Sequence, residues 1–135
     1  MTDSRARLPS ALLFLRASVF LVMAAWTVDK FVRPDHAAKV FGAFYFLPGV
    51  GRGLMLSVAA AEATLLVVFA LGIGKRWSYG LVTLLHGVST LSSYRQYLNP
   101  FEGGNLLFFA AWPMLAACWT LYVLRDDDTL LAVDK

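Results

Sequence analysis

The chain has 135 residues, of which 59% are hydrophobic and only 16% charged, whereas charged residues make up about 25% of an ordinary soluble domain. So apolar a composition leaves too little polar side chain to cover a surface in water, which favours a single-domain membrane protein. The net charge is +3, but the basic residues flank apolar segments, where they suit lipid headgroups. We therefore expect no nucleic-acid partner.

Four apolar segments fill most of the chain, and each is close to the roughly 20 residues that a helix needs to cross about 30 Å of hydrocarbon. Alternation with period 2 is absent, and four strands cannot close a barrel, so the segments are expected to be helices. The predicted fold class is an all-α membrane protein, a four-helix transmembrane bundle with a short interfacial helix in the first loop. Residues 1–135 form a single domain, with spans at about 8–28, 54–73, 77–94 and 105–124.

The first apolar segment follows Arg5 and Arg7, as in a signal peptide. However, it contains Arg16, continues into Trp26 and exceeds the usual apolar core of a signal peptide, so we interpret it as an uncleaved span. The longest loop comes next. Asp35 is suited to cap a short helix in it, and the aromatic residues that follow favour the membrane interface for that helix.

The later segments are closely connected. Lys75 and Arg76 are expected to form a tight turn, which makes the second and third spans an antiparallel hairpin. The fourth span begins near Asn105 and contains Pro113, which is expected to kink it or free a carbonyl. The acidic run at residues 126–128 is expected to be solvated.

Orientation is indicated by two compact basic pairs beside the spans, Arg5 with Arg7 and Lys75 with Arg76. Because basic residues concentrate in short cytoplasmic segments, these pairs favour a multi-pass protein with both termini in the cytoplasm.

Three ionisable residues lie within the apolar segments: Arg16, Glu62 and His86. A charged group at such a depth costs about 2.5–3.5 kcal/mol on insertion scales. With a helical rise of about 1.5 Å per residue, all three fall in one layer near the middle of the bilayer. The sequence therefore predicts an Arg16–Glu62 ion pair with His86 nearby, which lowers the cost of burying each group.

A polar stripe at steps of three or four residues marks one face of the third segment, and it must face inward or towards a partner. Its members are Thr83, His86, Ser89, Ser93 and Gln96. The predicted ligand site in the bilayer interior consists of Arg16, Glu62, His86, Ser89 and Ser93. The predicted entrance, on the side away from the termini, consists of Asp29, Lys30, Tyr94, Arg95 and Asn105.

Two interpretations of this polar layer remain open. It can form a site for a quinone headgroup, whose carbonyls need donors such as His or Arg while its tail stays in lipid, or it can relay protons. Equally, it can be structural, with an ion pair and Ser/Thr hydrogen bonds joining the four helices. No catalytic residue can be named from the sequence.

Metal and thiol chemistry are not expected. The lone cysteine, Cys118, can form neither an internal disulfide nor a CxxC pair, and it suits apolar packing. The two histidines, His36 and His86, lie on different segments without ligand spacing. We therefore predict neither a metal site nor a haem with two axial histidines within this chain alone.

Several short motifs recur in chain order and together resemble the DoxX-like family of small four-helix bacterial membrane proteins. They are Arg16 in the first span and Lys30 at its end, Pro48 in the loop, Glu62 in the second span, the exit from Gly72 to Arg76, and Asn105-Leu106-Leu107. The chain departs from the pattern where Trp26-Thr27-Val28-Asp29 replaces the usual small glycine before the lysine. His86 and its stripe do not map onto these motifs.

The resemblance implies a protein of the bacterial inner membrane, linked to redox systems; one branch of the family is similar to the membrane subunit of thiosulfate:quinone oxidoreductase. We therefore expect a membrane subunit or accessory of a quinone-linked redox complex, with quinone as cofactor and other membrane subunits as partners. Whether the chain itself is an enzyme stays open. The alternatives are a non-catalytic structural subunit with no enclosed cavity at the midplane and, less favoured, a small transporter.

Overall fold

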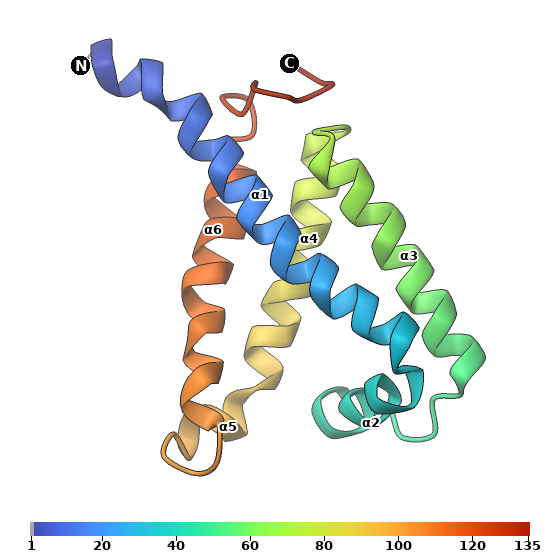
Figure 1. Cartoon of the computed structure of the whole chain (residues 1–135). Coiled ribbons are helices and arrows are strands. Elements are labelled where there is room, and N and C mark those ends of the chain that lie inside the picture. The colour runs from blue at the N-terminus through green and yellow to red at the C-terminus, as the bar shows by residue number, and fades with distance from the viewer. Residues whose placement is uncertain (1) are drawn as a thin grey trace.

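The structure is a computed structural model that describes residues 2–135, which contain helices and no strand. This confirms the predicted all-α fold, and the helices are shown in Figure 1. In chain order they are α1 (Thr2–Val32), α2 (Pro34–Tyr45), α3 (Arg52–Ala70), α4 (Lys75–Ser92), α5 (Tyr94–Leu98), the 3₁₀ helix η1 (Asn105–Ala110) and α6 (Ala111–Val123).

Three of the helical segments are long and apolar enough to cross a membrane: Asp3–Val32, Arg52–Ala70 and Asn105–Val123. Large apolar side chains face outward on them, for example Phe14 on α1 with 74% of its surface exposed and Leu107 on η1 with 80%. Side chains of this kind are tolerated singly on a soluble protein but not over whole helices, so this surface suits lipid.

Helices α1 and α4 each pack against both α3 and α6. Helix α1 crosses the bundle obliquely, and both ends of the chain lie at the same end of the molecule (Figure 1). We call this the terminal end, and the opposite end, where α2 and α5 lie, the loop end. The closest packing joins α1 to α3 and α4 to α6. The buried apolar core includes Leu12, Leu66, Phe69, Val82 and Leu121.

Helix α2 confirms the short helix predicted in the first loop, but Asp35 is not its cap. Arg33 occupies the cap position without a side-chain hydrogen bond, and Pro34 is the first helical residue. Proline suits this position because its missing N–H has no partner there in any helix. Asp35 instead lies in the first turn, where its charge interacts favourably with the helix dipole.

The turn between α3 and α4 is also shifted from the prediction. Lys75 and Arg76 already belong to the first turn of α4, and residues 71–74 make the connection. Gly72 and Gly74 both have positive φ angles, 65° and 54°, which glycine adopts without the steric cost that a Cβ brings.

Pro113 affects the last span near its start. The chain is a 3₁₀ helix up to Ala110 and becomes α-helical at Ala111. Pro113 is the third residue of α6, directly after the point where the 3₁₀ helix gives way to the α-helix. Its missing N–H cannot bond to a carbonyl of the preceding turn.

The polar stripe predicted on the segment that forms α4 is buried in part. His86 and Ser93 are buried, whereas Thr83, Ser89 and Gln96 are half-buried; Thr90, which was not among the predicted residues, is buried as well. The hydroxyl groups bond to backbone carbonyls: Thr90 donates to His86 O at 2.7 Å, and Thr83 donates to Cys118 O on α6 at 3.1 Å. Since these groups have partners, the polar face of α4 can lie inside the bundle.

Candidate functional site

Arg16 does not form the ion pair predicted with Glu62. Its guanidinium, only 2% exposed, pairs with Asp128 at 3.0 Å and donates to the Tyr79 hydroxyl at 3.0 Å. It also donates to the carbonyl oxygens of Leu130, at 2.6 Å, and Leu131, at 3.1 Å. The Tyr79 hydroxyl in turn donates to Asp128 at 2.7 Å. The Arg16 and Tyr79 bonds both go to Oδ2 of Asp128, whereas its Oδ1 has no hydrogen-bond partner among the described residues. With four bonds from its guanidinium, Arg16 has little capacity left for a ligand.

Asp128 belongs to a segment that folds back over the terminal end, which we call the C-terminal strap (residues 125–134). The prediction of a solvated acidic run is wrong for Asp128, whose exposure is 0%. Lys75 donates to the Asp128 carbonyl at 2.7 Å, and Val133 N donates to Leu71 O at 2.8 Å. The strap thus bonds to α1, to α4 and to the turn between α3 and α4.

Gly72 allows this close approach. A Cβ built on Gly72 would lie 2.6 Å from the Ala132 Cβ and 3.1 Å from the Arg16 Nη1. No real side chain fits at the first of these distances, so the strap can lie here only against a glycine.

Glu62 pairs instead with Lys30, at 2.8 Å, and accepts a hydrogen bond from Thr27 at 3.2 Å. Lys30 comes 14 residues after Arg16, about 21 Å further along α1 at the helical rise. The predicted single layer is therefore wrong. The depth estimated from the sequence places the start of every span at the membrane edge. However, α1 projects past the other helices at the terminal end (Figure 1). Arg16 therefore lies at the level of the first turns of α4, where it bonds to Tyr79.

A cavity of about 720 Å³ lies between α1, α2, α4, η1 and α6. Five of the predicted site and entrance residues line it: His86, Ser89, Ser93, Asp29 and Lys30. The other five are not among its lining residues: Arg16, Glu62, Tyr94, Arg95 and Asn105. The structure therefore gathers His86, Ser89 and Ser93 and the end of α1 around one space. The Arg16–Asp128 pair lies outside it, and of the Lys30–Glu62 pair only Lys30 reaches its wall.

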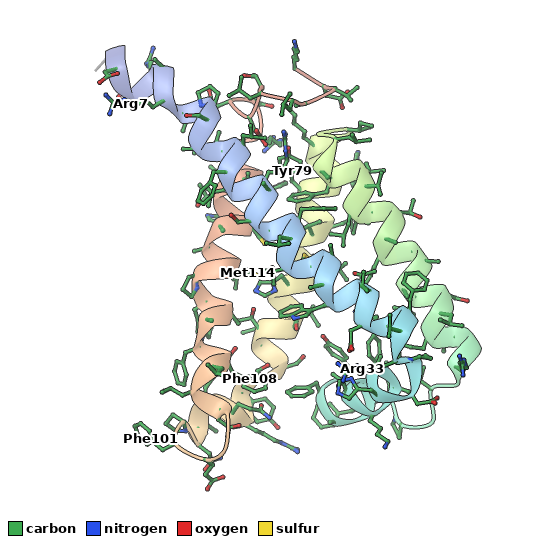
Figure 2. The ribbon with its side chains drawn as sticks, in the orientation of Figure 1. Arg7, Arg33, Tyr79, Phe101, Phe108 and Met114 are labelled. Atoms are coloured by element: carbon green, nitrogen blue, oxygen red, sulfur yellow. The ribbon has the colours of Figure 1, made fainter. Side chains whose placement is uncertain are left out.

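The walls of the cavity are largely apolar and aromatic. Sequence reasoning did not single out these residues, which include Val22, Trp26, Phe44, Phe108 and Met114. Phe44 of α2 and Phe108 of η1 stack with centroids 5.9 Å apart. Figure 2 shows Phe108 towards the loop end and Tyr79 towards the terminal end. For Trp26 the sequence does contain a signal. Trp26 precedes Lys30 by four residues, and residues four apart lie on the same face of a helix.

The predicted entrance residues that do not line the cavity form contacts within the loop end. Arg95 donates to the Tyr94 hydroxyl at 3.2 Å and lies over the Phe46 ring, while Asn105 donates to Asn99 O at 2.9 Å. Asp29, on the cavity wall, accepts hydrogen bonds from Arg33 at 2.6 Å and from His36 at 3.1 Å.

Tyr97 closes the base of the α4 stripe by donating to Thr90 O at 2.8 Å. Burial raises the pKa of its phenol above the ordinary value, and the Ser93 hydroxyl opposes that rise. The phenol therefore stays protonated and keeps its donor role.

His86 is the most enclosed polar group of the cavity wall, with 1% of its surface exposed. Its Nε2 lies 3.1 Å from Ala111 O on α6. Trp26 stacks on the imidazole, with centroids 6.0 Å apart and an angle of 27° between the planes. The other ring nitrogen, Nδ1, has no hydrogen-bond partner among the residues that the structure describes.

Within residues 2–135, no three or more His, Cys, Asp or Glu side chains gather as a metal site. No known protein family, curated protein or solved structure matches this chain. The resemblance to the DoxX-like family therefore stays a prediction from the quoted motifs, and function has to be argued from the cavity.

Proposed function

We propose that this chain is a four-helix transmembrane protein of the bacterial inner membrane, DoxX-like in type, that binds a quinone as a membrane subunit or accessory of a redox complex. The observation that carries the proposal is the cavity of about 720 Å³, apolar over most of its wall and polar along α4. Small-molecule sites in proteins usually measure about 300–1,000 Å³ and combine apolar walls with a few polar groups.

The proposal treats α4 as the fourth span. Its 18 residues reach about 27 Å at the helical rise, close to the hydrocarbon thickness. It is the least apolar of the four, but its buried hydroxyl groups bond to carbonyls of α4 itself or of α6. Three apolar helices around it would keep its polar face from lipid.

The cavity residues suit the two parts of a quinone. A flat ring can stack against aromatic side chains such as Trp26 and Phe108, and an isoprenoid tail matches the apolar walls. Ser89, one turn beyond His86 on α4, and Lys30 on α1 bring hydrogen-bond donors to the wall. A bound quinone would supply two-electron transfer between membrane partners, while these residues orient its head and exclude water.

The non-catalytic structural subunit is less favoured, because it predicts no enclosed cavity at the midplane, whereas a cavity of about 720 Å³ lies among the helices. The observation that favours the structural subunit is the Arg16–Asp128 network, which joins α1 to α4 and to the C-terminal strap and does not line the cavity. We assign that network to the scaffold and the cavity to binding. For the transporter alternative, no feature of the described residues offers specific support.

Tryptophan fluorescence tests the proposal. Quinones quench indole emission at contact, and Trp26 lines the cavity whereas Trp77 lies exposed on the first turn of α4. Titrating the purified protein in detergent with a short-chain ubiquinone or menaquinone should give saturable quenching. Trp26→Phe should remove most of it, and the matched control Trp77→Phe should retain it. Quenching that never saturates, or that is equal in both variants, would refute quinone binding in this cavity.

A further inference from the structure

We propose that the terminal end of the bundle binds an anionic phospholipid, with its phosphate held in a second pocket where the start of α4, the end of α6 and the C-terminal strap meet. This pocket measures about 510 Å³ and shares no residue with the proposed quinone cavity. We call it the basic pocket; its lining residues are Lys75, Arg76, Arg125, Asp126, Asp134 and Lys135. The inference depends on α4 crossing the membrane, but not on quinone binding.

Positive charge prevails in the basic pocket. Four cationic side chains and two carboxylates line it, so its side chains carry an excess of two positive charges. Within residues 2–135, none of the four cationic groups lies within ion-pair distance of a carboxylate. Because the protein's own acidic groups do not neutralise these cations, the pocket attracts an anion.

The two carboxylates leave the cationic groups accessible. Asp134 accepts a hydrogen bond from Gly74 N at 2.5 Å, so it lies at the N-terminus of α4, where a negative charge interacts favourably with the helix dipole. Asp126 is exposed to solvent. A bound anion would therefore meet the cationic side chains of the pocket instead of the backbone N–H groups of α4.

Two of the cations are held in place by the fold. Lys75 is buried and donates to Asp128 O at 2.7 Å, and Arg125 donates from Nη1 to Tyr122 O at 2.8 Å. Each contact uses only part of the donor capacity, since both the ammonium and the guanidinium group carry further N–H donors. These remaining donors can bind phosphate oxygens, for which a guanidinium is especially suited because it can donate two parallel hydrogen bonds.

The surroundings of the pocket favour a lipid over a free phosphate. The Arg76 guanidinium lies over the ring of the exposed Trp77, 5.8 Å from its centroid. Tryptophan and basic residues together at the end of a span are typical of the level of lipid headgroups. Leu81 and Leu84, also exposed, continue from Trp77 along the same face of α4. This apolar face can hold the acyl chains of a lipid whose phosphate lies in the basic pocket.

A phospholipid bound in this way would stabilise the terminal end. Its phosphate would connect the start of α4, the end of α6 and the strap, which come together at that end of the molecule (Figure 1). Basic pockets between transmembrane helices bind the headgroups of anionic lipids by the same chemistry. A ligand that binds only the folded protein raises its stability, so lipid binding can be measured through the unfolding temperature.

Thermal unfolding of the purified protein in detergent, with increasing amounts of one added lipid, tests the site. Dioleoylphosphatidylglycerol should raise the unfolding temperature of wild type until it saturates. Dioleoylphosphatidylcholine, which has the same acyl chains and no net charge, should not. Arg76→Gln and Arg125→Gln should each need roughly tenfold more phosphatidylglycerol for the half-maximal shift, the scale expected for a lost hydrogen bond to a charged group.

Arg52→Gln is the matched control. Arg52 is an exposed arginine at the first position of α3 and does not line the basic pocket, so this variant should respond to phosphatidylglycerol as wild type does. Inorganic phosphate, added at constant ionic strength, should leave the unfolding temperature unchanged. Native mass spectrometry counts the bound lipid molecules and gives a second readout that does not depend on the stability of a variant.

The proposal would be overturned if phosphatidylglycerol gave no saturable shift, or if phosphatidylcholine gave the same shift. Undiminished binding of phosphatidylglycerol by both Arg76→Gln and Arg125→Gln would also exclude the basic pocket. A shift with inorganic phosphate as large as that with phosphatidylglycerol would show a site for free anions instead of lipid. The quinone titration reports on a different cavity, so either proposal can fail while the other stands.

Discussion

Arg16 and Asp128 lie 112 positions apart in the chain and form an ion pair of 3.0 Å in which neither side chain is more than 2% exposed. Tyr79 bonds to both members, and two carbonyls of the C-terminal strap accept from Arg16. A buried pair with this many additional hydrogen bonds can offset its desolvation. It joins the first helix to the segment that follows the last one.

Removing the carboxylate should therefore destabilise the protein strongly. Asp128→Ala leaves Arg16 buried without its counter-charge, and such a loss costs about 3–5 kcal/mol. Asp127→Ala removes the exposed neighbouring carboxylate and should change stability little. Thermal unfolding in detergent measures both variants. Equal unfolding temperatures for the two would mean that the Asp128 pair does not stabilise the fold.

The Lys30–Glu62 pair should contribute less. Its side chains are 14% and 20% exposed, so water screens them in part. We expect Glu62→Gln to cost about 1–2 kcal/mol, and Glu102→Gln in the exposed loop to cost nothing measurable. The same unfolding assay compares the stability lost in the two variants. A loss for Glu62→Gln as large as that for Asp128→Ala would contradict the smaller contribution expected of the Lys30–Glu62 pair.

Gly72→Ala tests the docking of the strap. Alanine meets two penalties there, a left-handed backbone and a Cβ only 2.6 Å from Ala132. Gly74→Ala meets the backbone penalty alone, about 1–3 kcal/mol, because nothing lies within 4 Å of its Cβ. Gly72→Ala should thus be clearly the less stable variant and should make the strap more susceptible to limited proteolysis. Similar behaviour of the two variants would count against tight docking.

Membrane orientation can be tested with single cysteines, because the native Cys118 is buried. Ala6 and Glu102 are both exposed. Ala6 belongs to the beginning of α1, near the N-terminus at the terminal end, and Glu102 follows α5, which lies at the loop end (Figure 1). If both termini are cytoplasmic, a membrane-impermeant maleimide added to intact spheroplasts should label Glu102→Cys at once and Ala6→Cys only after lysis. The reverse pattern would invert the orientation, and labelling of both sites before lysis would argue against four spans.

The sequence was sufficient for the helices and for the inward face of α4, because both follow from local periodicity. The partners of the charged residues were not predictable in the same way. Counting residues from assumed membrane edges pairs Glu62 with Arg16, whereas its actual partner is Lys30, which lies about half the length of α1 beyond Arg16. Asp128 looked like one of three solvated acids, since nothing local reveals that the chain turns back after α6.

The cavity was predicted only in part, for a related reason. His86, Ser89 and Ser93 could be identified because they recur on one helix face. The aromatic walls come from segments that are distant in sequence, such as Phe44 and Phe108, which meet only in the folded chain. Which ring nitrogen of His86 has a hydrogen-bond partner depends on the position of one carbonyl in α6. No pattern of residue types in the sequence specifies that position.

The Arg16–Asp128 pair also has a consequence for biogenesis. A ribosome adds roughly 5–20 residues per second, so the 112 positions between the two residues correspond to about 6–22 s of elongation. Throughout that interval the nascent first helix carries its guanidinium without the carboxylate that later neutralises it. The insertion machinery, or water at the bilayer surface, has to accommodate this charge until the last helix has been made and the strap can close.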